Sequence, residues 1–209
     1  MGKLVSFEFL GVYGIALLLA DMPKQIHDAI VNKVVFPAYT KFVELPRSEF
    51  SRKIQKARLP LLIVFAFGIA TLVGTGDLFV SVLYDDRYAD AAWMLPIMAL
   101  GIWPAILHGS IDQALFAIGN PRYVAYGCFW SAVFLISGIL LGFHWFGPRG
   151  AVIAMACSNI PPYSVIMYGL WQEKIVCLKQ DLMATALFLG LIAVIVGGRI
   201  LAGFPPEIF

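Results

Sequence analysis

Residues 10–42 read LGVYGIALLLADMPKQIHDAIVNKVVFPAYTKF, and this stretch decides the fold. It begins as an apolar segment and then carries polar side chains through its second half. Asp21, Lys24, Asp28 and Asn32 follow one another at separations of three or four residues, so a helix places them on one face. The opposite side is apolar and suits lipid or protein.

A charged side chain at the centre of a bilayer costs about 3 kcal/mol, so this polar stripe needs water or partners. One interpretation is a polar cavity in which the stripe binds a ligand, through Lys24, Lys33, Asp21, Asp28, Asn32 and His27. The other is an ion-pair ladder of Asp21, Lys24 and Asp28 that only neutralises itself. The sequence leaves both open.

The composition predicts an all-α integral membrane protein. The chain has 209 residues, of which 60% are hydrophobic and 13% charged, and its net charge of +2 gives no indication of nucleic-acid binding. We expect one polytopic membrane domain over 1–209, with about six apolar helices of roughly 20 residues or more. They are expected near 10–36, 59–83, 92–118, 122–144, 150–171 and 182–203.

The distribution of lysine and arginine predicts the orientation. A basic loop is expected at 41–58, and together with 120–122 and 172–181 it holds nine Lys and Arg residues, against four on the other side. The positive-inside rule therefore places the 41–58 loop in the cytoplasm and both termini outside. An outside start without a visible signal is unusual, so we expect part of a longer protein or half of a two-lobed bundle.

A second polar group lies on the third expected helix. His108 and Asp112 are four residues apart and can meet on one face, with Gln113 beside them. A proton- or sodium-coupling site is one interpretation, and a structural His–Asp bond between helices is the other. Asn159, which precedes two prolines in the fifth expected helix, is a weaker cavity candidate.

Catalysis finds little support in the sequence. The acidic run at 85–90, DDRYAD, resembles a magnesium-binding cluster of a lipid-phosphate enzyme, but no second acidic cluster accompanies it. A solvated loop is the better interpretation. No Ser/His/Asp set, P-loop or HExxH is present, and the three cysteines lie far apart. We therefore expect no enzyme, no cofactor and no metal site.

Five short motifs, in order along the chain, carry a resemblance to a transporter family. LGVYGIA at 10–16 resembles the L-G-x-Y-x-x-A that opens a helix in the second lobe of polysaccharide and O-antigen flippases of the MOP exporter superfamily. FPAYTK at 36–41 is similar to the cytoplasmic end of that helix. The outer loop and next helix at 76–100, the turn AIGNPR at 117–122 and FGPRGAVIA at 146–154 also resemble this family.

The resemblance implies roughly helices eight to thirteen of a transporter that moves polyprenyl-diphosphate-linked oligosaccharide between leaflets by alternating access. It implies a bacterial cytoplasmic (inner) membrane, a role in surface polysaccharide or lipopolysaccharide synthesis, and membrane lipids with a separate N-terminal half or a second copy as partners. Lys24 and Lys33 match the cavity cations that hold diphosphate. Asp85 departs from a usual glycine, and Leu18 replaces an arginine of the lipid II relative, which argues for another sugar lipid. A cation-coupled drug exporter of the same superfamily and an intramembrane lipid-modifying enzyme are the alternatives.

Overall fold

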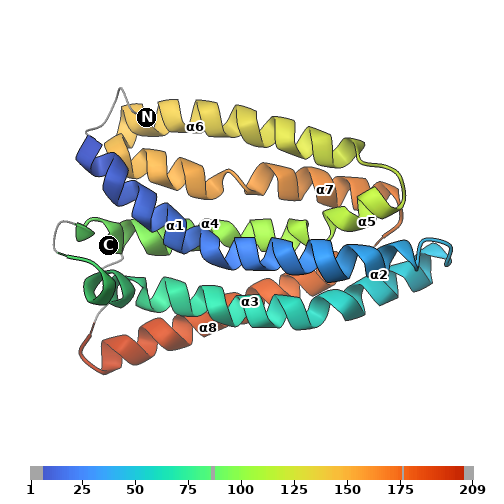
Figure 1. The fold of residues 1–209 in the computed structure, drawn as a ribbon, viewed down its shortest axis with the longest axis horizontal. Coiled ribbons are helices and arrows are strands. Elements are labelled where there is room, and N and C mark those ends of the chain that lie inside the picture. Colours follow the sequence, from blue (N-terminus) through green and yellow to red (C-terminus); the bar gives the residue numbers. More distant parts are fainter. Residues whose placement is uncertain (1–6, 86–87, 176, 205–209) are drawn as a thin grey trace.

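The computed structural model describes residues 7–85, 88–175 and 177–204, and within these ranges every regular element is a helix. The helices lie alongside one another in an elongated bundle (Figure 1). Their bounds are α1 Phe7–Ile30, η1 Val31–Val35, α2 Phe36–Thr40, α3 Arg47–Leu83, α4 Ala91–Gly109, α5 Asp112–Ala117, α6 Arg122–Cys157, α7 Ile160–Gln172 and α8 Leu178–Leu201.

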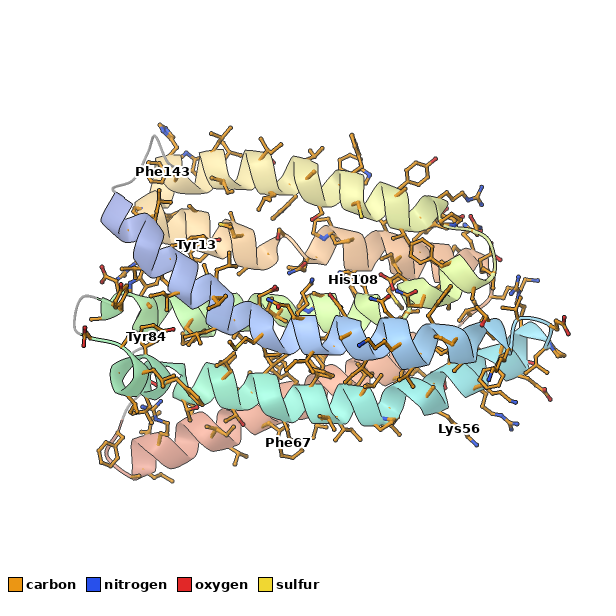
Figure 2. All side chains as sticks on the ribbon, viewed as in Figure 1. Tyr13, Lys56, Phe67, Tyr84, His108 and Phe143 are labelled. Carbon is orange, nitrogen blue, oxygen red and sulfur yellow. The ribbon has the colours of Figure 1, made fainter. Side chains whose placement is uncertain are left out.

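The prediction of an all-helical protein with membrane-spanning helices is confirmed for the described residues. Five helical segments of the described chain are long and apolar enough to cross a membrane: Phe9–Thr40, Arg47–Leu83, Ala91–Ala117, Arg122–Gln172 and Leu178–Leu201. Large apolar side chains such as Val64, Val82 and Met183 are exposed, so lipid can cover them. Phe67 of α3, 53% exposed, is labelled in Figure 2. The chain is accordingly a multi-pass membrane protein.

The segment 122–172 folds back on itself, which explains how it holds two of the expected helices. Gly147 adopts φ 61° and ψ −147°, a backbone conformation that glycine tolerates best, and Pro148 follows it. The two halves then run side by side (Figure 1). Gly142 and Gly150 touch backbone to backbone, and the Ser131 hydroxyl donates to the Ser158 carbonyl at 2.9 Å.

Helix α4 is the centre of the bundle and packs against α1, α3, α6 and α7. In the most apolar stretch of 91–117, 72% of the residues are buried, compared with 6% in the corresponding stretch of the hairpin segment 122–172. The sequence AAWMLPIMALGIWPAIL is apolar on every side, as a fully enclosed helix requires. Small residues let neighbours approach closely, since Gly101 lies directly against the backbone of Ala156.

The prediction of a basic loop at 41–58 is wrong for most of this segment. Residues 47–58 are the first turns of α3, which begins after Pro46. Phe50, Ile54 and Arg58 are buried at intervals of four residues, so this part is an amphipathic helix whose lysines and arginines lie mostly on its outer side. The many charged residues of this segment made the four-residue spacing of its buried side chains hard to recognise in the sequence.

The helix that opens the chain contains an irregularity where the polar stripe ends. A π-helical turn, η1, joins α1 to α2. Pro37 lies in the first turn of α2 and has no N–H to donate to the preceding turn, so a wider turn accommodates its ring. Asn32 and Lys33 lie within this π-turn and are both exposed.

Replacement of Gly101 by alanine tests the close contact of α4. An added Cβ overlaps backbone atoms of Ala156, which cannot move aside as a side chain can. We therefore expect the free energy of unfolding to fall by about 1–3 kcal/mol. Thermal unfolding of the purified protein in detergent measures it. Gly190→Ala in α8 is the matched control, because no atom lies within 4 Å of its added Cβ. Equal melting temperatures for the two variants would contradict the packing.

Candidate functional site

The polar stripe of α1 is partly paired and partly open. Lys24 Nζ lies 3.0 Å from Asp28 Oδ2, and Gln25 Nε2 donates to Asp21 Oδ2 at 3.3 Å. The side chains of Lys24 and Asp28 nevertheless remain 34% and 41% exposed. The pairs expected of an ion-pair ladder therefore form, and the exposure of the face leaves the ligand-binding interpretation open.

Lys33 is a further lysine near the end of the stripe. Its side chain is exposed, and within the described residues it forms no ion pair or hydrogen bond. It lies in the π-turn, next to Asn32. An unpaired lysine in a helix long and apolar enough to span a membrane is costly unless water or an anion accompanies it.

His27 does not line the open face, contrary to the sequence prediction. It is fully buried and packs edge-on against the Phe65 ring of α3, with the ring centroids 5.1 Å apart. Nδ1 lies 3.1 Å from Asp28 Oδ1, and because a carboxylate only accepts, this nitrogen carries the hydrogen. His27 falls in helical register with the buried Ala20 and Val31, which explains its inward direction.

The fold brings the polar groups of the first and third expected helices together. Gln113 Nε2 of α5 donates to Asn32 Oδ1 of η1 at 3.5 Å, the outer limit of a hydrogen bond. Gly109, at the end of α4, leaves room for His27 and Asp28, which approach within 3.3 and 3.6 Å of the place where a Cβ would lie. The α1–η1 stripe and the α4–α5 junction thus form one polar face.

Several buried polar atoms in and around this face have no hydrogen-bond partner among the described residues. His108 Nδ1 lies 3.9 Å from Asp112 Oδ2, within the range of an ion pair but too far for a hydrogen bond. Both ring nitrogens of His108 and Asp112 Oδ1 are buried without a hydrogen-bond partner among the described residues, and so is His27 Nε2 on the inner side of α1. Such atoms need water, an ion or a ligand, because each unsatisfied buried group costs about 1–3 kcal/mol.

A small cavity lies beside the stripe, between α1, α4 and the hairpin. It has a volume of about 190 Å³, and its lining includes Asp21, Lys24 and Asn159. The Asn159 amide donates to the Gly101 carbonyl at 2.9 Å, where α6 gives way to α7, so this residue also fixes the position of the helix break.

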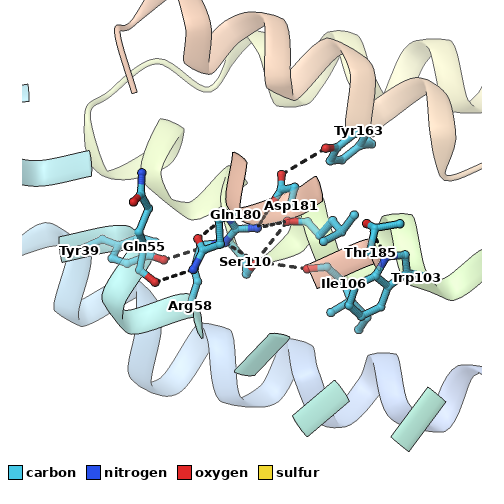
Figure 3. Close-up of polar contacts among 11 residues, drawn as sticks. Tyr39, Gln55, Arg58, Trp103, Ile106, Ser110, Tyr163, Gln180, Asp181 and Thr185 are labelled. Atoms are coloured by element: carbon cyan, nitrogen blue, oxygen red, sulfur yellow. Dashed lines mark hydrogen bonds and ion pairs between the residues drawn. The ribbon is translucent and has the colours of Figure 1, made fainter. Parts of the chain in front are cut away.

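A fully buried polar site surrounds Arg58 (Figure 3). The sequence did not predict it, because Arg58 falls within the expected basic loop at 41–58. Arg58 of α3 is fully buried, and its Nη2 lies 2.8 Å from Asp181 Oδ1 of α8. Its Nε donates to the Ser110 hydroxyl at 2.9 Å, and Nη2 also donates to the Leu107 carbonyl at 3.0 Å. One guanidinium therefore joins α3, the end of α4 and α8.

Further hydrogen bonds complete this network. The Tyr163 hydroxyl of α7 donates to Asp181 Oδ2 at 3.2 Å, and the Tyr39 hydroxyl of α2 donates to the Ser110 carbonyl at 3.2 Å. Gln180 accepts from Arg58 Nη1 at 3.3 Å and donates to the Gln55 carbonyl at 2.7 Å. Every charged group is thus paired and hydrogen-bonded, as a buried ion pair requires.

A second Arg–Asp pair joins α3 and α8 further along, with the charges reversed. Arg199 of α8 lies 2.6 Å from Asp77 Oδ1 and 2.8 Å from Asp77 Oδ2, in a two-pronged contact. The two pairs are separated by similar numbers of residues on both helices, 19 on α3 and 18 on α8, so α3 and α8 run parallel and in a fixed register.

The acidic run at 85–90 is described only in part. Asp86 and Arg87 of the acidic run lie outside the described residues, while Asp85 and Asp90 are exposed. No three His, Cys, Asp or Glu residues of the described chain converge on a metal position. The cysteines are free thiols, and burial raises the pKa of the Cys177 thiol, which lies just before α8.

The comparisons with known proteins give no family for the chain: no protein-family model, no curated protein and no solved structure matches it.

Replacement of Arg58 by methionine tests the buried network. The change leaves the Asp181 carboxylate buried and unpaired, so we expect a loss of about 3–5 kcal/mol in unfolding free energy. The double variant Arg58→Met/Asp181→Leu removes both charges, and we expect it to recover most of that loss. Denaturant titration of the detergent-solubilised protein measures both. A double variant as unstable as the single one would show that the charges are not coupled.

Proposed function

We propose that the chain forms one lobe of a transporter that flips a polyprenyl-diphosphate-linked oligosaccharide across the bacterial cytoplasmic membrane, for surface polysaccharide synthesis. The observation that carries this proposal is the half-open polar face of α1 and η1, beside which the exposed Lys33 has no partner among the described residues and lies in a helix long enough to span a membrane. A face of this kind suits a large amphipathic anion that enters from the side of the bundle.

The residues of the face suit both parts of such a substrate. Lys33 attracts a diphosphate directly, whereas Lys24 must first exchange its partner Asp28 for a phosphate oxygen. Asn32 and Gln113 present amide groups, which both donate and accept, and their mutual contact of 3.5 Å is weak enough to yield to sugar hydroxyls. The face therefore combines exchangeable charge with adaptable hydrogen bonding.

The open side of this face supports a two-lobed arrangement. Only 22% of the residues in the most apolar stretch of 9–40 are buried, so this helix keeps exposed surface that a second lobe or lipid can cover. A separate N-terminal half or a second copy of the chain would enclose the cavity, and rocking of the two lobes would expose it alternately to the two sides of the membrane. The π-turn η1 gives the polar helix a site at which it can bend.

The second candidate function is a cation-coupled exporter, and the unpartnered polar atoms around Asp112 favour it. Asp112 and His108 are 15% and 17% exposed, and neither makes a hydrogen bond to the other. A carboxylate and an imidazole in such a place can take up and release a proton, or bind sodium with water. Such coupling is also compatible with the first candidate, as the driving force of flipping.

Substitution of the stripe lysines tests the proposal in cells that carry the whole transporter. We expect Lys33→Ala to weaken substrate binding by about 10- to 100-fold, the equivalent of about 1.5–3 kcal/mol for a charged contact, and to lower export accordingly. Lys24→Ala is expected to have a smaller effect, because Asp28 already shares its charge. The measurement is the amount of lipid-linked oligosaccharide that reaches the outer leaflet.

Lys41→Ala and Lys53→Ala are the matched controls, since both lysines are exposed and lie outside the polar face. Normal export in the Lys24→Ala/Lys33→Ala double variant would refute the proposal. Transport of another solute that depends on a sodium or proton gradient, with no change in sugar-lipid export, would favour the second candidate.

A further inference from the structure

A groove between α3 and α8 lies apart from the polar face of α1 and has a different character. Its volume is about 590 Å³. Three basic residues, Arg52, Lys56 and Lys179, contribute to its lining, and the described residues that line it include no acidic side chain. All three are exposed, and none of them forms an ion pair or hydrogen bond within the described residues.

Because α3 and α8 run parallel, the basic residues that line the groove lie at one end of it, the basic end, and the apolar residues line the rest, the apolar body. Arg58 pairs with Asp181, so Arg52 and Lys56 lie on the same side of that pair as Lys179. Leu59 and Ile63 of α3, with Met183 and Leu187 of α8, follow in the opposite direction along both helices. The basic end belongs to the part of the chain that the distribution of lysine and arginine assigns to the cytoplasm.

The floor of the groove is fixed by the buried network beneath it. Gln55 and Gln180 line the groove, and the Gln180 side chain bridges the two helices through the Gln55 carbonyl and Arg58. Deeper along the floor, Ala184 is buried and small, which leaves a hollow above it that a larger side chain would fill. The hollow is therefore a feature of a rigid contact between α3 and α8.

We propose that this groove binds an anionic phospholipid of the surrounding leaflet, with its phosphate among Arg52, Lys56 and Lys179 and one acyl chain along the apolar body. The argument is charge complementarity: three unpaired cations converge at the headgroup end, and the rest of the lining is mainly apolar. Basic pockets between membrane helices recognise anionic headgroups in this way, and each cation contributes about fivefold to affinity. The proposal is independent of the transported substrate.

Native mass spectrometry of the purified full chain tests the site, with phosphatidylglycerol and phosphatidylcholine offered at equal mole fraction. We expect the protein to retain one phosphatidylglycerol in preference to phosphatidylcholine. The variant Arg52→Gln/Lys56→Gln/Lys179→Gln is expected to lower phosphatidylglycerol binding by more than tenfold. Its control, Lys41→Gln/Lys53→Gln/Lys174→Gln, removes the same charge from lysines that do not line the groove and is expected to bind as the unmodified protein does.

A second pair of variants tests the apolar body without any change of charge. Met183→Trp fills the groove from an exposed position, 75% accessible, whereas Leu182→Trp adds the same bulk at a neighbouring exposed position outside it. We expect only Met183→Trp to reduce phosphatidylglycerol binding. Equal losses for the two triple variants, equal losses for the two tryptophan variants, or no preference for phosphatidylglycerol in the unmodified protein would each overturn the proposal.

Discussion

The buried contact between Arg58 and Asp181 is the constraint on which the rest of the bundle depends. Taking two charges out of water is costly, so the fold must supply each of them with a full set of hydrogen bonds. It does so by bringing Ser110 of the α4 end, Tyr163 of α7 and Gln180 of α8 to the same place. Any shift of α8 along α3 would break the pair, and the second pair at Asp77 and Arg199 holds the same register.

This fixed core explains why the polar face lies where it does. The α4 end that Arg58 holds through Leu107 continues directly into His108, Gly109 and the α4–α5 junction. On the other side of that junction stand Asn32 and Asp28 of the first helix. The rigid ion pair thus supports one wall of the face, while the partly exposed α1 and its π-turn form the other.

Local patterns in the sequence predicted the helical membrane class and the polar stripe of α1, because both follow from composition and helical period. They also indicated the polar group around Asp112, although not its contact with Asn32. The central ion pair could not be predicted, because Arg58 and Asp181 are 123 residues apart and pairing at that distance depends on tertiary packing. One local signal was present: Phe50, Ile54, Arg58 and Leu62 recur every four residues, which places Arg58 on a buried face. His27 was misassigned because it neighbours the stripe in sequence but lies on the other side of the helix.

If the stripe of α1 and η1 faces water within the membrane, as the proposed function requires, a cysteine placed on it must react with a water-soluble reagent. The test uses a variant in which Cys128, Cys157 and Cys177 are replaced. Single cysteines are then introduced as Asn32→Cys or Ile26→Cys, both at exposed positions. We expect a membrane-impermeant maleimide to label the cysteine at position 32 rapidly in intact membranes and to leave the one at position 26, on the apolar side, unlabelled. Equal labelling at the two positions, or none at position 32, would contradict it.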